Sequence, residues 1–131
     1  MIDPQHAFAS LFLWIAAIGF LAAFALPLTF VPLAWARVFR WRVPAETHLA
    51  IYFGRCVGAL ATTITAFALR AAPDPAAHRY MFELIAVACG LMTMIHIWGA
   101  IRRIQPWTET AEIALYAATT AFAWGALATL G

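Results

Sequence analysis

One long uncharged stretch constrains the fold of this chain more than any other sequence feature. No aspartate, glutamate, lysine or arginine occurs in residues 4–36. A helix that crosses a bilayer needs about 20 consecutive apolar residues, so this stretch is long enough to span one. Three further apolar stretches with few charges follow it. The pattern predicts an all-α integral membrane protein, a four-helix transmembrane bundle.

Composition favours a lipid environment over a water-soluble fold. Hydrophobic residues make up 65% of the chain and charged residues 11%, whereas soluble domains have about 45–50% and about 25%. A domain of 131 residues cannot bury so much apolar surface in its own interior. Residues 1–6 contain no lysine or arginine, so the basic start of a cleavable signal peptide is missing. The first apolar run is therefore expected to remain as a helix.

Prolines divide what we expect to be a single transmembrane domain, residues 1–131. The expected helices cover residues 4–26, 44–70, 75–103 and 106–130. An Asp-Pro pair stands at the start of the first and third helices and is a helix-start signal. Pro27 is expected to end or kink the first helix. Residues 32–42 mix aromatic side chains with arginines, which is typical of a short amphipathic segment at the membrane interface.

The arginines predict an orientation in the membrane. One end of the predicted helices carries five: Arg37, Arg40, Arg42, Arg102 and Arg103. The other end carries two, Arg70 and Arg79. The positive-inside rule places the five-arginine end in the cytoplasm and both termini on the non-cytoplasmic side. Eight arginines without a lysine, together with abundant alanine, are typical of a GC-rich bacterial genome, so the expected location is a bacterial inner membrane.

Ionisable side chains inside the spans are the main functional signal, because a charge at the bilayer centre costs about 2.5–3.5 kcal/mol on insertion scales. They share one face on each of the last three helices: His48, Tyr52 and Arg55; His96; and Glu109, Glu112 and Tyr116. Helical rise puts most of them in one layer of the cytoplasmic leaflet. We predict an ion pair between Arg55 and Glu112, with His96 beside it.

The leading functional hypothesis is a polar pocket in this layer that binds a small lipophilic or weakly polar ligand. Its expected ligand-binding residues are Arg55, His96, Glu112, Tyr52, Tyr116 and His48. Arg55 is the expected anchor for an anion or carbonyl group. An alternative is a membrane enzyme acting on a lipid-, sterol- or quinone-like substrate, with His96 and Glu112 as candidate catalytic acid–base residues.

A purely structural interpretation stays open beside these two. A single Arg–Glu pair can fix the register of two helices, and the dipole of the fourth helix favours carboxylates such as Glu109 in its first turn. Arg102 and Arg103 lie just before that turn and are expected to neutralise them. Near the opposite face, Glu83 is expected to pair with Arg70, Arg79 or His6.

Gly54 and Gly58 form a GxxxG pattern that allows helices to approach closely. Packing inside the bundle is one interpretation. The other is a docking face for a homo-oligomer or for a larger membrane complex, in which the chain is an accessory subunit. Besides the lipid bilayer, a lipophilic small molecule is the other expected partner. The arginines form no dense basic face, so nucleic acid is not expected.

No cofactor or metal ion is expected from the sequence. Bis-histidine ligation of haem needs two imidazoles at matched depth, but His48 and His96 differ by about 7 to 8 Å along their helices. Cys56 and Cys89 are isolated in apolar segments, and no HxxxH or Cys/His cluster occurs.

Overall fold

The computed structural model describes residues 1–131 and contains helices and no strands. The elements are α1 (Ala7–Phe20), the π-helical η1 (Leu21–Ala25), α2 (Leu26–Phe30), α3 (Pro32–Val38), α4 (His48–Ala71), the 3₁₀ helix η2 (Ala76–His78), α5 (Tyr80–Arg102) and α6 (Trp107–Ala128). Four helices are long and apolar enough to cross a membrane. The prediction of an all-α four-helix transmembrane bundle is confirmed, and the chain is a multi-pass membrane protein.

The first span ends later than predicted, at Phe30 rather than at residue 26, because α1, η1 and α2 run on as one helix from Ala7. Pro27 does not end it. Proline lacks the N–H that would bond the carbonyl of Ala23 in an α-helix, and the helix loosens into a π-helical turn immediately before this point. The indole N–H of Trp35 donates to the Ala23 carbonyl at 2.9 Å. A side chain from the next helix thus replaces the missing backbone donor.

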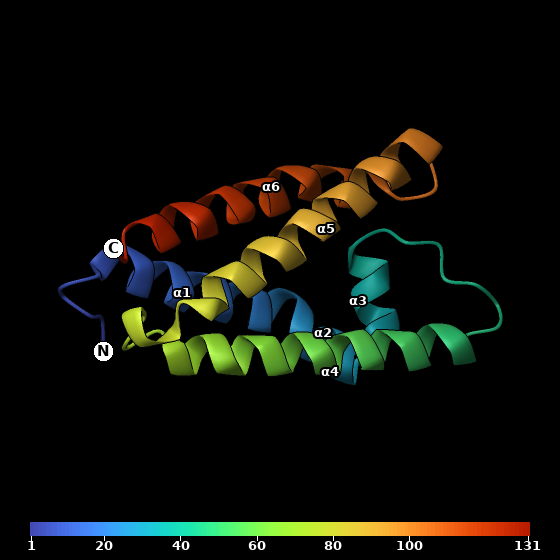
Figure 1. The fold of residues 1–131 in the computed structure, drawn as a ribbon. Coiled ribbons are helices and arrows are strands. Elements are labelled where there is room, and N and C mark those ends of the chain that lie inside the picture. The colour runs from blue at the N-terminus through green and yellow to red at the C-terminus, as the bar shows by residue number, and fades with distance from the viewer.

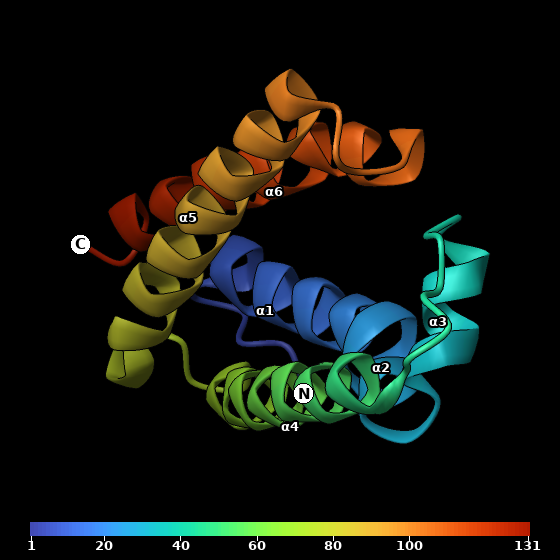
Figure 2. The same cartoon turned by 90° about the vertical axis from the view of Figure 1, so that its right-hand side faces the viewer.

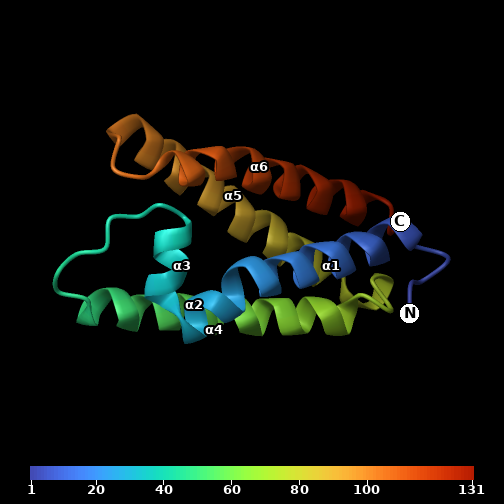
Figure 3. The same cartoon turned by 180° about the vertical axis from the view of Figure 1, so that it is seen from behind.

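Helix α3 folds back from the end of the first span and runs crosswise to α4 (Figures 1 and 3). It packs through aromatic rings, because Phe39 stacks on Trp35 with centroids 4.5 Å apart and both rings contact Phe24. The segment predicted as interfacial, residues 32–42, therefore packs against the first span through these rings. The following helix, α4, begins at His48 rather than at residue 44.

Helix α1 lies between α4 on one side and the α5–α6 hairpin on the other (Figure 2). Helices α5 and α6 pack along each other, whereas α4 packs on α1, η1 and α2. Helices α4 and α5 meet near their connecting turn and then diverge (Figure 1). As a result, the two halves of the bundle separate toward the end that holds α3.

The apolar core lies at the end of the bundle that holds both termini. Its buried residues come from one face of α1, from the C-terminal ends of α4 and α6 and from the first turns of α5. Small residues dominate, and the larger Leu13, Met81 and Phe82 fill the space between them. Most apolar side chains elsewhere face outward, as expected where lipid is the solvent.

Gly54 and Gly58 pack inside the protein against its own first span. A Cβ added at Gly58 would clash with the backbone nitrogen of Thr29, and one at Gly54 would lie 2.6 Å from Cβ of Pro32. Of the two interpretations of the GxxxG pattern, this contact supports packing within the bundle.

The expected pairing of Glu83 does not form. Glu83 is exposed and has no ion pair. Arg79 donates to the carbonyl oxygens of Leu130 and Gly131, at 2.8 and 3.2 Å, and so binds the C-terminal end of α6. Arg79, one of the expected partners of Glu83, therefore bonds to backbone carbonyls instead of to this carboxylate.

Candidate functional site: a histidine and two glutamates between α5 and α6

The short turn from α5 to α6 positions the site. Arg103 adopts the left-handed conformation that ends α5, and Pro106 precedes the first turn of α6. The side chain of Gln105 folds back and donates to the carbonyl of His96 at 3.0 Å. It fits because Gly99 has no side chain, since a Cβ there would fall on the Gln105 amide. The last turns of α5 therefore face the first turns of α6.

His96 is buried, with 5% of its surface exposed, and its tautomer follows from its contacts. Nδ1 lies 2.7 Å from the carbonyl oxygen of Met92. A carbonyl only accepts hydrogen bonds, so Nδ1 carries a proton. Nε2 points the other way, 3.2 Å from Oε2 of Glu109 and 3.7 Å from Oε2 of Glu112. A carboxylate also only accepts hydrogen bonds, so the contact with Glu109 requires a proton on Nε2, a proton on the carboxyl group, or a cation between the two atoms.

The two glutamates come from one face of α6, because positions three residues apart are neighbours on a helix. Each is only 7% exposed. Oε1 of Glu109 accepts a hydrogen bond from the indole N–H of Trp41 at 2.8 Å. Oε1 of Glu112 is fully buried and has no hydrogen-bond partner within 3.5 Å, although the Tyr116 side chain lies close enough to this carboxyl group to interact with it. Unpaired buried carboxylate oxygens are costly, so this atom marks a site that the protein alone leaves unsatisfied.

Tyr116 and the first span form the apolar wall of the site. The Tyr116 ring lies one turn after Glu112, is 4% exposed and has its centroid 4.9 Å from that of His96. Phe20 meets the other edge of the Tyr116 ring at 6.5 Å. These rings exclude solvent and lipid from one side of the carboxylates.

The segment after α3 covers the site from the other side. Besides the indole of Trp41, the carbonyl of Phe39 accepts a hydrogen bond from the hydroxyl of Thr108 at 2.5 Å. The guanidinium of Arg40 lies over the ring of Trp107, 5.9 Å from its centroid. This segment thus bridges the two halves of the bundle where they separate, and the bridge ends on a carboxylate of the site.

Electrostatics makes the cluster a cation acceptor. Nε2 of His96 and one oxygen each of Glu109 and Glu112 lie within 4.8 Å of one another. Neither Arg102 nor Arg103 pairs with the carboxylates, and Arg102 lies over the ring of Trp98 instead. Two carboxylates brought together away from water are stabilised by a proton on one of them or by a positive charge between them. A proton on Nε2 or a metal cation can supply it.

Two of the three separations between the ligand atoms suit a metal ion. A tetrahedral zinc site with bonds of about 2.0–2.2 Å separates adjacent ligand atoms by about 3.3–3.6 Å. The observed separations from His96 Nε2, 3.2 and 3.7 Å, bracket that range. Metal-binding histidines almost always donate their other ring N–H to a carbonyl or carboxylate, and His96 does so to Met92.

The structure brings together three of the six residues expected to bind a ligand, namely His96, Glu112 and Tyr116. The other three, Arg55, Tyr52 and His48, lie on exposed faces of α4 away from the cluster. The predicted ion pair between Arg55 and Glu112 is wrong. Depth along the helices does not decide such a contact, because α1 stands between α4 and α6.

Two members of the cluster, Glu109 and Trp41, were not among the residues expected to form the site. Glu109 shares a face with Glu112, but its place in the first turn of α6 suggested a partner of the helix dipole. Trp41 resembled one more interfacial tryptophan. The spacing of three between the glutamates, next to a short turn from His96, was the available signal for Glu109. No local signal identifies Trp41, because its contact spans 68 residues of chain.

Comparison with protein families, curated proteins and solved structures found no match to this chain. The geometry of the cluster is therefore the basis for assigning a function.

Proposed function

We propose that this multi-pass membrane protein binds a divalent metal ion of the first transition row between α5 and α6. His96, Glu109 and Glu112 would be the protein ligands. The observation that carries the proposal is the convergence of three buried acceptor atoms on one point, with Nδ1 of His96 already bonded to a carbonyl. Imidazole suits zinc, iron and nickel, and carboxylates suit manganese, so a mixed set favours such ions over calcium or magnesium.

Two further contacts support the proposal. The unpaired oxygen of Glu112 offers an additional donor to a cation, and the indole of Trp41 orients Glu109 as outer contacts of metal ligands do. Three protein ligands leave one tetrahedral position for water or another ligand, which is the pattern of exchanging and catalytic sites rather than closed structural ones.

Metal titration of the purified protein in detergent micelles tests the proposal. We expect one Zn²⁺ per chain, measured by competition with a chromophoric chelator. His96→Ala and Glu112→Gln should each weaken binding at least about 100-fold, since each removes an inner ligand. The controls are His48→Ala and Glu83→Gln, which remove the same chemistry from exposed positions. Equal affinity in wild type and Glu112→Gln, or equal losses in the controls, contradicts the proposal.

An acid–base role for His96 and Glu112 is the second candidate, favoured by the unpaired Glu112 oxygen and the 3.7 Å separation of the two groups. In that role a proton takes the place of the metal, and His96 is an imidazolium in the metal-free protein. The ¹⁵N resonances of His96 distinguish the two states. If the ring stays doubly protonated when Zn²⁺ is added, the result favours proton exchange over metal binding.

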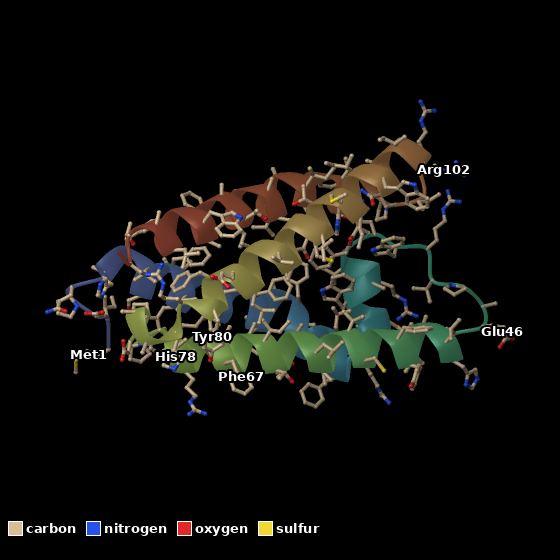
Figure 4. The ribbon with its side chains drawn as sticks, in the orientation of Figure 1. Met1, Glu46, Phe67, His78, Tyr80 and Arg102 are labelled. Carbon is tan, nitrogen blue, oxygen red and sulfur yellow. The ribbon has the colours of Figure 1, made fainter.

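The arginine distribution supports an orientation with both termini outside the cytoplasm and the site near the cytoplasmic face of a bacterial inner membrane. Arg102 and Glu46 lie at one end of the molecule, and Met1 and His78 at the other (Figure 4). Single cysteines introduced at 46 and 78, in a background without Cys56 and Cys89, test this. In intact cells a membrane-impermeant maleimide should label position 78 and spare position 46. The reverse pattern inverts the orientation.

A further inference from the structure

Arg55 lies inside a membrane-spanning helix without a protein partner. It occupies the third turn of α4, and its side chain is exposed. None of the ion pairs and none of the side-chain hydrogen bonds involves it. A guanidinium remains charged at any physiological pH. In a lipid environment it therefore requires an anion or water from outside the protein.

A shallow pocket opens beside this arginine. Its volume is about 270 Å³, and apart from Arg55 it is lined by Val31, Pro32, Leu33, Ala34 and Ile51. The pocket lies where the start of α3 approaches α4. The ring of Pro32 packs closely against Gly54 of α4 and so holds the start of α3 beside this helix. An apolar surface with a single cation at its side matches the junction between an acyl chain and a charged headgroup.

The position of Arg55 along α4 also suits contact with a lipid headgroup. Arg55 follows His48 by seven residues, which is about 10 Å along the helix. A long arginine side chain extends several ångströms further toward the headgroup level while its stem stays in the apolar layer. Glu46, the one carboxylate in the segment before α4, is exposed and not bonded to Arg55.

We propose that this pocket binds an anionic phospholipid, with the headgroup phosphate on Arg55 and the first part of an acyl chain along Val31, Leu33 and Ile51. The planar guanidinium forms two parallel hydrogen bonds to phosphate, which a single ammonium does not. The site is separate from the His96 cluster and does not depend on metal binding there. It gives Arg55 the anion-anchoring role that its sequence position suggested.

Native mass spectrometry of the detergent-solubilised protein tests the proposal, with phosphatidylglycerol and phosphatidylcholine offered at equal concentration. Wild type should retain phosphatidylglycerol at least about tenfold better, because the choline ammonium of phosphatidylcholine neutralises its phosphate and repels Arg55. Arg55→Gln should lose that preference. Arg55→Lys should keep part of it. The matched control is Arg70→Gln, because Arg70 is also exposed on α4 but lies at the opposite end. It should behave like wild type.

Ile51→Trp provides an independent test because it fills the pocket and leaves the charge in place. It should reduce phosphatidylglycerol retention while Zn²⁺ binding stays unchanged. Retention of the lipid by both Arg55→Gln and Ile51→Trp overturns the proposal. So does an equal loss in Arg70→Gln, or equal retention of the two lipids by wild type. Displacement of the lipid by millimolar inorganic phosphate alone shows a site for soluble anions and overturns it as well.

Discussion

The two polar regions of this bundle have charged groups in apolar surroundings and stabilise them differently. Between α5 and α6, His96 and two glutamates are buried and face one another. On α4, Arg55 is exposed and faces no acidic group. The difference arises because the halves of the bundle diverge at this end and α1 separates them. The first region is organised to enclose an ion, and the second is open to lipid.

The largest expected effect on stability comes from the contact between α4 and the first span. Gly58→Ala should destabilise the fold by about 1–3 kcal/mol, because the new Cβ would meet the backbone of Thr29. Gly19→Ala is the control, since nothing lies within 4 Å of a Cβ there. Thermal unfolding in one detergent measures both. Equal melting temperatures for the two variants contradict the packing of the Arg55 region on the first span.

The buried carboxylate of Glu112 should oppose folding in the absence of metal. Glu112→Leu removes a charge and an unpaired oxygen, so the metal-free protein should gain about 1 kcal/mol or more. It should also lose the rise in melting temperature that Zn²⁺ gives to wild type. Glu83→Leu, at an exposed position of the same hairpin, should stay within about 0.5 kcal/mol. A metal-free Glu112→Leu protein less stable than wild type points to a hidden partner for this carboxylate.

Trp41 should act as a positioning residue for Glu109. Trp41→Phe keeps an aromatic ring at this position but loses the indole N–H, and the expected loss of Zn²⁺ affinity is about tenfold. Trp98→Phe is the control, because Trp98 is exposed on α5 and outside the cluster. Unchanged Zn²⁺ affinity in Trp41→Phe would show that the segment after α3 does not position Glu109.

Arg55 should contribute least to stability. Arg55→Gln is expected to change the free energy of unfolding by less than about 0.5 kcal/mol in a neutral detergent, because the side chain has no partner in the protein. Chemical denaturation checks this. A loss greater than about 2 kcal/mol shows an internal partner and removes the contrast between the two regions.

Hydropathy was sufficient to predict the fold class, because lipid requires long apolar helices whatever their packing. It did not predict the continuation of the first span past Pro27. That depends on a donor from Trp35, which only the folded structure supplies.

The sequence was sufficient to predict only part of the site. Residues near a short turn were placed correctly, since His96 and Glu112 have little freedom to lie apart across four turn residues. Arg55 was misplaced because helical rise gives depth and says nothing of which helices are neighbours. Trp41 was missed because it reaches Glu109 from a distant part of the chain.

X-ray absorption spectroscopy at the zinc edge of the Zn²⁺-loaded protein is the most direct measurement of the proposed site. We expect a first shell of four nitrogen and oxygen atoms at about 2.0–2.1 Å, with the scattering pattern of a single imidazole that His96→Ala abolishes. A sulfur atom at about 2.3 Å, contributed by Cys56 or Cys89, contradicts this ligand set. So does a shell of water oxygens without imidazole.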